Sequence, residues 1–120
     1  VQERRCIIPS SGFYEWGEAQ QSLFDMPRRG NAGKTKYQFH LPGTRLLYMA
    51  GIWNTFRDEH GSESPRFVIL TASANGAMRD IHDRMPVVLR PEECVHWLSP
   101  NPDLHSLFDR EHVLLEREIV

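Results

Sequence analysis

Short segments with strand-like patterns, separated by turns rich in proline and glycine, run through most of the 120 residues. Some alternate polar and apolar side chains, as residues 36–41 do, and others are short aliphatic runs, as in residues 66–71. No long crossover helix separates one such segment from the next, and strands joined in this way pair antiparallel. We therefore expect an α+β fold, mainly β, with an antiparallel curved sheet or partly open barrel and two or three short helices.

Turn chemistry sets the expected strand boundaries. Residues 36–41 and 46–56 flank a Pro-Gly-Thr turn and are expected to pair as a hairpin. Within the second strand, Gly51 marks a bulge or a close approach of two backbones. The expected strands are 4–9, 13–16, 36–41, 46–56, 66–71, 85–89 and 112–119.

The helical and loop segments are fewer. Pro91 suits the first position of a helix that ends near Leu98, and Asn101 is expected to cap a second helix that ends at Phe108. Residues 17–36 have little periodicity and read as a long loop, either a solvated one or an arm that contacts phosphate. The basic residues in its second half are Arg28, Arg29, Lys34 and Lys36.

Length, charge and cysteine content limit the class of protein. The length predicts one domain over residues 1–120. A net charge of −2 and a pI of about 6.3 give no support for strong non-specific binding of nucleic acid. Cys6 and Cys94 form no C-x-x-C pair, so the sequence indicates neither a zinc site nor a disulfide, and this usage fits a reducing cytoplasm. No apolar run reaches membrane length.

The first candidate site is Gly12-Phe13-Tyr14-Glu15-Trp16. Glu15 is the misfit in this stretch, because a carboxylate among aromatic rings needs a partner or its pKa rises. Groups perturbed in this way collect at functional sites. Trp16, like Trp53 and Trp97, is first a candidate for the core, and it could also stack on a nucleobase.

The second candidate site is the run His82-Asp83-Arg84, which lies between a turn and a strand. Histidine beside a carboxylate is suited to proton transfer, and arginine is suited to phosphate or carboxylate. The alternative is a surface loop in which Asp83 pairs with Arg84 and His82 is idle. His40 reads as a cross-strand partner, and no histidine and cysteine have the spacing of a metal site, so no metal and no cofactor are expected.

Several motifs together resemble the SRAP family, the SOS-response-associated peptidase-like proteins that shield abasic sites in DNA. The resemblance covers about residues 4 to 100. It rests on the order and spacing of five segments rather than on one short pattern. These segments are Arg-Arg-Cys-Ile-Ile-Pro at 4–9, Gly-Phe-Tyr-Glu-Trp at 12–16, Ala-Gly-Ile-Trp at 50–53, Phe-Val-Ile-Leu-Thr at 67–71 with Ala74-Asn75, and Ile-His-Asp-Arg-Met-Pro-Val-Val-Leu at 81–89.

The resemblance implies an activity and its residues. Family members use an N-terminal cysteine that condenses with the aldehyde of an abasic site and closes a thiazolidine, which crosslinks protein to DNA; the same group is linked to self-peptidase activity. Glu15 and His82 match the family's acid–base residues. Trp16, Thr71 and Arg84 match positions that line a groove for single-stranded DNA. Partners are therefore single-stranded DNA with abasic sites and no membrane, for a cytoplasmic monomer of bacterial or phage origin.

The chain departs from the family pattern at its start. The Met-Cys-Gly-Arg-like beginning and the active-site asparagine that precedes the Arg-Arg-Cys segment are both missing. Cys6 is internal and has no free α-amine, and Asn75 belongs to another motif. We expect the chain to be the C-terminal major part of an SRAP domain rather than a degenerate member. The alternative function is a non-catalytic module that binds single-stranded or damaged DNA.

Overall fold

The computed structural model describes residues 4–18 and 34–120. The two helices in this part of the chain are short and follow one another near its C-terminal end. The elements, in chain order, are β1 (Arg5–Ser10), β2 (Phe13–Glu18), β3 (Lys34–His40), β4 (Leu47–Arg57), β5 (Glu63–Ile69), β6 (Thr71–Ser73), β7 (Arg84–Pro86), β8 (Val88–Leu89), α1 (Pro91–Trp97), α2 (Leu104–Phe108) and β9 (Glu116–Ile119).

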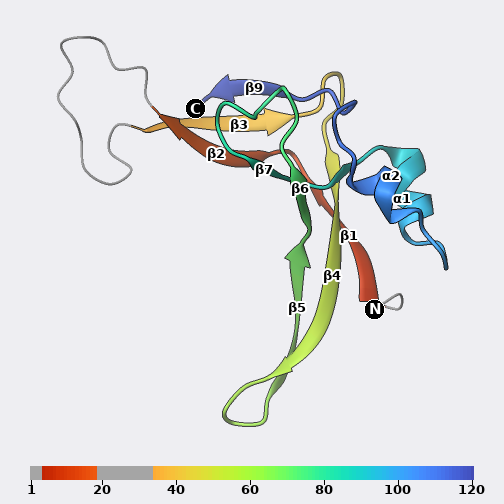
Figure 1. Cartoon of the computed structure of the whole chain (residues 1–120). Helices are drawn as coiled ribbons and strands as arrows, with labels where there is room; N and C mark the ends of the chain where they lie inside the picture. Colours follow the sequence, from red (N-terminus) through yellow and green to blue (C-terminus); the bar gives the residue numbers. More distant parts are fainter. Residues whose placement is uncertain (1–3, 19–33) are drawn as a thin grey trace.

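The described strands form three antiparallel sheets. The largest has the order β1-β4-β5, with β8 added along β4; the second has the order β2-β3-β9, and the third pairs β6 with β7. Figure 1 shows the β2-β3-β9 sheet lying across one end of the long β4-β5 ribbon, with both helices beside the junction. The expected mainly β fold with antiparallel strands and short helices is confirmed, and the sheets do not close into a barrel.

The expected hairpin of residues 36–41 with 46–56 is wrong. β3 pairs with β2 and β9, whereas β4 pairs with β1, β5 and β8. The turn after His40 carries the chain from one sheet to another instead of folding it back. Gly51 does mark a close approach, because a Cβ there would lie 2.2 Å from Ile8 Cδ1 and 3.0 Å from the Val68 carbonyl oxygen.

Two boundaries also differ from expectation. Lys34 and Lys36 belong to β3 rather than to a loop, while Arg28 and Arg29 lie outside the described residues. The cap of α2 is Asp103 and not Asn101, because the Asp103 carboxylate accepts a hydrogen bond from the Ser106 amide at 3.3 Å. The asparagine lies too early in the chain to reach an amide in the first turn of α2.

Among residues 4–18 and 34–120, the buried apolar side chains form three clusters, one beneath the helices, one beneath β3, and one between β4 and β8. Trp97 belongs to the first cluster, with 2% of its surface exposed, and its indole N–H donates to the Cys6 carbonyl oxygen at 3.0 Å. Trp16 and Trp53 do not belong to the core, since 43% and 39% of their surfaces are exposed. The expectation of a core role is therefore confirmed only for Trp97.

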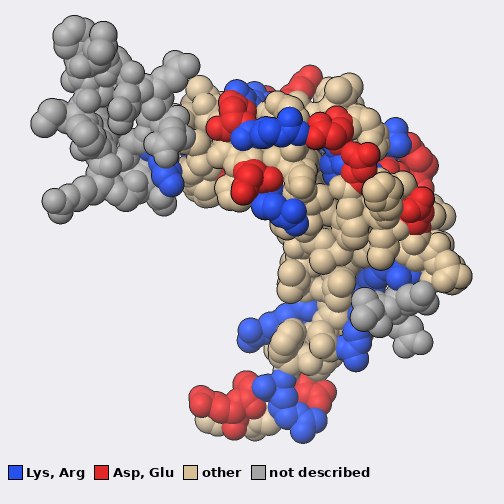
Figure 2. All heavy atoms as spheres, viewed as in Figure 1, with Lys and Arg blue, Asp and Glu red and all other residues tan. Residues whose placement is uncertain are grey.

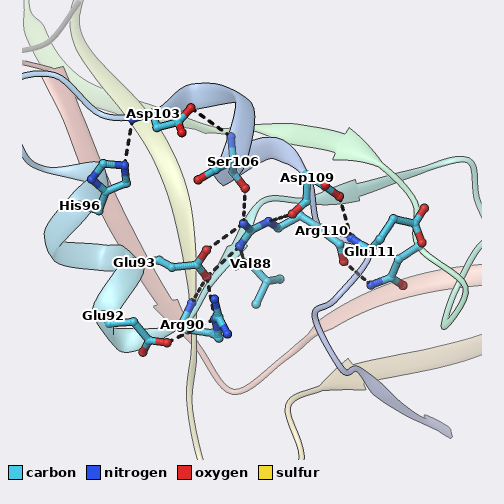
Figure 3. A network of polar contacts seen from close by, with 11 residues as sticks. Val88, Arg90, Glu92, Glu93, His96, Asp103, Ser106, Asp109, Arg110 and Glu111 are labelled. Atoms are coloured by element: carbon cyan, nitrogen blue, oxygen red, sulfur yellow. Dashed lines mark hydrogen bonds and ion pairs between the residues drawn. The ribbon is translucent and has the colours of Figure 1, made fainter.

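A buried arginine holds the helices against the large sheet. The Arg110 guanidinium donates two hydrogen bonds to the Glu93 carboxylate, at 2.9 and 2.8 Å, and another to the Val88 carbonyl oxygen at 2.9 Å (Figure 3). A fourth bond goes to the Ser106 carbonyl oxygen at 2.8 Å. Elements β8, α1 and α2 are thereby joined through one side chain, with the charges paired as burial requires.

The β4-β5 ribbon extends away from the rest of the molecule as an arm (Figure 1). Large apolar side chains on it are exposed: Trp53, Phe56, Phe67 and Val68. In Figure 2 a hollow opens between this arm and the β2-β3-β9 sheet, and basic side chains lie on both sides of it. Within residues 4–18 and 34–120, no helix is long and apolar enough to cross a membrane.

Candidate functional site

The inner face of β2 carries Glu15. Side chains alternate along a strand, so Phe13, Glu15 and Gly17 share one face. The Phe13 ring stacks on the buried Phe39 ring at 5.1 Å, and Gly17 is buried against Ile81, whose Cδ1 would lie 2.7 Å from a Cβ at Gly17. Glu15 is therefore a half-buried carboxylate between two packed positions, on the face turned toward the 78–82 turn.

The opposite face of β2 carries two exposed rings, Tyr14 and Trp16, beside the half-buried Lys36. Lys36 is the β3 residue directly across from Trp16 in the antiparallel register. Its ammonium lies 4.2 Å from the centre of the Tyr14 ring and 5.7 Å from that of the Trp16 ring. A cation held over two exposed rings combines stacking area with positive charge, the pairing that single-stranded nucleic acids require.

Thr71 and Arg84 are in direct contact. Thr71 opens β6 and Arg84 opens β7, and these two strands pair antiparallel. The Arg84 guanidinium donates to the Thr71 carbonyl oxygen at 2.8 Å and to the Thr71 hydroxyl oxygen at 3.1 Å. Both bonds come from one nitrogen, so the contacts described for residues 4–18 and 34–120 leave the other guanidinium donors open to an anion.

His82 lies directly before this strand and is bonded to its backbone. The His82 Nδ1 accepts a hydrogen bond from the Arg84 amide at 3.0 Å and lies 3.1 Å from the Arg84 carbonyl oxygen. Asp83 Oδ1 is 3.4 Å from the same nitrogen. Asp83 thus lies near His82, and the described ion pairs do not join it to Arg84, in contrast to the alternative that the sequence left open.

The segments that carry Glu15 and His82 are in contact through residues next to them in the chain. Ile81, the residue before His82, packs on Gly17, two positions after Glu15. On the same face of the sheet, Arg117 of β9 donates to the Asp80 carboxylate at 2.8 and 3.0 Å, which pins the turn to the sheet. No hydrogen bond or ion pair joins Glu15 to His82 directly among the described contacts.

Sequence reasoning put Tyr14 in the first candidate stretch and Lys36 in the 17–36 segment, but it did not bring these two side chains together. Lys36 was assigned to a loop, although it also opens the alternating segment 36–41. Pairing that segment with 13–16 instead of 46–56 would have brought Lys36 opposite Trp16. Only the identity of the neighbouring strand was lacking, and local periodicity does not contain it.

Neither cysteine has the features of an activated nucleophile. Both thiols are free. Burial raises the pKa of the Cys6 thiol, and burial together with Glu93 and Glu92 raises the pKa of Cys94. A raised pKa leaves less thiolate at neutral pH. Within residues 4–18 and 34–120, no group of three or more histidine, cysteine or acidic side chains is arranged to hold a metal ion.

Comparison with known proteins gives one consistent result. The family model described as "SOS response associated peptidase (SRAP)" matches residues 1–117. The chain is 34% identical over 108 residues to the abasic site processing protein YoqW of Bacillus subtilis, a match that covers 87% of this chain and 44% of that protein. It is 30% identical over 115 residues to the abasic site processing protein HMCES of Xenopus tropicalis, covering 80% of this chain and 31% of that protein.

Solved structures agree with the sequence matches. A crystal structure of a protein from Bacteroides thetaiotaomicron superimposes with a TM-score of 0.76 at 28% identity, covering 98% of this chain and 49% of the other. The chain thus spans less than half the length of the curated relatives named above and about half of this structural relative.

Proposed function

The chain belongs to the SRAP family, and from that premise we propose that it processes abasic sites in DNA. The substrate is single-stranded DNA that carries a ring-opened abasic sugar. The curated relatives are named as abasic site processing proteins, which supports this class of substrate. Because the chain spans only part of those relatives, the activity belongs to the whole protein and this chain supplies one portion of its site.

The proposed chemistry is the closure of a thiazolidine on the abasic aldehyde. The α-amine of an N-terminal cysteine adds to the aldehyde carbon, and loss of water gives an imine. The thiol sulfur then adds to the imine carbon while the thiol proton moves to nitrogen, which closes the ring and crosslinks protein to DNA. Cys6 and Cys94 have no free α-amine, so the nucleophile is not among these residues. Self-peptidase activity, of hydrolase or lyase type, belongs to the same proposal.

Glu15 and His82 are proposed to move the protons in these steps. Opening the sugar ring and losing water from the carbinolamine each need one proton accepted and one donated. A half-buried carboxylate and an exposed imidazole can do this when both face one cavity. The observation that carries the assignment is the packing of Ile81 on Gly17, because it ties the histidine's segment to the face of β2 that bears Glu15.

Two surfaces are proposed to bind the single-stranded DNA. Arg84, already held by Thr71, contacts a backbone phosphate. Trp16, with Tyr14 and Lys36 beside it, stacks on an unpaired base. These side chains also favour the second candidate function, a module that binds single-stranded DNA reversibly and performs no chemistry. A cytoplasmic monomer from a bacterium or phage fits either function, and one relative is encoded by Bacillus phage SPbeta.

A crosslinking assay separates these functions. The full-length protein is incubated with an oligonucleotide that carries one abasic site, and the products are run on a denaturing gel. The proposal predicts a band of protein joined to DNA, formed at least about tenfold more slowly by Glu15→Gln and by His82→Ala, in line with typical acid–base contributions. Reversible binding measured on the same variants should change by less than about threefold.

The outcomes are distinct. No crosslinked band, together with salt-sensitive reversible binding, would support the binding module and overturn the proposed chemistry. Equal losses of binding and of crosslinking in both variants would assign Glu15 and His82 to binding or to folding instead. Phe56→Leu, on the far arm, serves as the matched control and should leave both measurements unchanged.

A further inference from the structure

The backbone amide of Arg84 is directed away from its partner strand. In the β6-β7 pair, Ser73 lies opposite Arg84, and the Ala74 amide donates to the Asp83 carbonyl oxygen at 2.9 Å. This bond flanks a position where the two opposite residues exchange no hydrogen bonds, so the Arg84 N–H points outward from the ladder. It donates instead to His82 Nδ1 at 3.0 Å.

This contact bears on which nitrogen of the neutral imidazole carries the proton. A nitrogen that accepts from an N–H has its lone pair in use and cannot itself be protonated. With Nδ1 as the acceptor, the single proton of neutral His82 lies on Nε2. The donor is a main-chain amide at the start of β7, so its direction is set by the strand and not by a mobile side chain.

Two acceptors near Nδ1, the Asp83 carboxylate and the Arg84 carbonyl oxygen, would favour the opposite tautomer, in which Nδ1 carries the proton. Their effect is weaker than that of the Arg84 amide. Asp83 Oδ1 lies 3.4 Å from Nδ1, but 91% of the Asp83 side chain is exposed and its charge is solvated. The Arg84 carbonyl oxygen, at 3.1 Å, would accept from Nδ1 in the opposite neutral tautomer, but that tautomer would leave the Arg84 amide facing an N–H instead of an acceptor. An unpaired amide N–H is rarer in proteins than a carbonyl with unused acceptor capacity. Once the ring gains a second proton, Nδ1 donates to this carbonyl oxygen. The same nitrogen therefore has a partner in both charge states, and in the neutral state that partner is a donor.

We propose that the Arg84 amide holds neutral His82 as the Nε2–H tautomer, so that His82 acts as a hydrogen-bond donor through Nε2 and Glu15 acts as the proton acceptor. Nε2–H would donate to an oxygen of the opened sugar as negative charge develops there. The catalytic half of this statement rests on the proposed function. The proposed tautomer does not depend on it, since its support comes from contacts within the free protein.

The test is a long-range proton–nitrogen correlation spectrum of the protein labelled with ¹⁵N-histidine, recorded at a pH where the rings are neutral. The His82 signal is the one that disappears in His82→Ala. We expect a pyrrole-type shift at Nε2 and a pyridine-type shift at Nδ1, without averaging. The reference is His60, whose side chain is 82% exposed and lies 3.5 Å through Nε2 from the similarly exposed Glu59 carboxylate; its two ring-nitrogen shifts should be averaged between the tautomers. A His82 pattern averaged like that of His60, or reversed, overturns the proposal.

A matched pair of variants isolates the amide. Arg84→Ala removes the guanidinium and keeps the N–H, whereas Arg84→Pro removes both. Proline is tolerated where the amide takes no part in the ladder. We expect His82 to stay in the Nε2–H form in Arg84→Ala. In Arg84→Pro we expect its two ring-nitrogen shifts to be averaged between the tautomers. If Arg84→Pro does not fold, as a backbone amide spectrum would show, the wild-type comparison with His60 decides the question alone.

Activity tests the donor role separately. Glutamine can place an N–H near the position of Nε2, but it cannot exchange a proton as imidazole does. His82→Gln should therefore crosslink abasic DNA at least about fivefold faster than His82→Ala. Equal rates would overturn the donor role while the spectrum still reports the tautomer. A full-length protein that forms no crosslink at all would instead reject the proposed function and leave the tautomer intact.

Discussion

At the scale of single residues, glycines fix how closely β2 approaches its neighbours. A Cβ at Gly12 would lie 2.5 Å from the Phe39 carbonyl oxygen, a backbone atom that cannot move without shifting β3. Gly76 has no described atom within 4 Å of such a position. We expect Gly12→Ala to lower the free energy of unfolding by about 1–3 kcal/mol, as overpacking does. Gly76→Ala should change it by less than about 1 kcal/mol.

Urea unfolding of both variants measures these changes. If the two variants were equally stable, the close approach at Gly12 would not exist in solution. The comparison also bears on the site, because Gly12 lies in the turn just before β2, the strand that carries Glu15. If Gly12→Ala lost crosslinking and Gly76→Ala kept it, the loss would come from a displacement of β2 and of Glu15 on it.

Residue chemistry nominated most of the candidate site from the sequence. Glu15 stands out because it is an acid among rings, and His82 because it lies beside an acid and an arginine. The contact between Thr71 and Arg84 could not be predicted, since it depends on the pairing of β6 with β7. Arg110 gave no signal at all, because an arginine in a polar stretch reads as a surface residue until its partner Glu93 is known.

At the scale of elements, local patterns predicted where strands occur but not how they pair. Alternation in residues 36–41 and the apolar run in 66–71 are properties of each segment alone. Strand partners depend on contacts between distant residues, as with β1 and β4, where Ile7 lies opposite Ala50. The turn after residue 41 has hairpin composition yet leads into a different sheet. Hairpin chemistry therefore indicates a change of direction and does not determine the partner.

The helices depend on the ion pair of Glu93 with Arg110. Burial by itself raises the pKa of Glu93, but hydrogen bonds from Arg110 and from the Arg90 backbone outweigh it and lower the pKa to about 2. Because the pKa is lower in the folded state, ionised Glu93 stabilises the fold at pH values above its unfolded pKa of 4.5. This stabilisation is lost as the pH falls toward 2. The contribution is on the order of 3 kcal/mol.

Glu93→Gln tests this contribution through the pH dependence of unfolding. The wild-type protein should lose stability between about pH 4.5 and pH 2, as Glu93 takes up its proton. In the variant that part of the slope should be absent, and stability at pH 7 should fall by about 3–5 kcal/mol because Arg110 is left buried without its partner. Glu92→Gln, which alters an exposed neighbour, is the control. A wild-type slope retained in Glu93→Gln would contradict the assignment.

At the scale of the whole molecule, the charge is distributed unevenly although the total is small. The net charge is −2, so long-range attraction to DNA is weak. Basic side chains nevertheless lie on both sides of the hollow between the arm and the β2-β3-β9 sheet (Figure 2). Affinity for single-stranded DNA should then come from a few local phosphate contacts and from stacking, and not from a uniformly positive surface.

This distribution predicts a shallow dependence of DNA binding on salt. Each phosphate contact on a single strand contributes about −0.7 to the slope of log K against log salt concentration. For the full-length protein, Arg84→Ala should reduce the magnitude of that slope by about 0.7, because one contact is lost. Trp16→Ala should weaken binding by about 1–3 kcal/mol with the slope unchanged, because stacking releases no counterions. Titrations of an unmodified oligonucleotide at several salt concentrations measure both. If Arg84→Ala left the slope unchanged, its guanidinium would not contact phosphate, and its bonds to Thr71 would be purely structural.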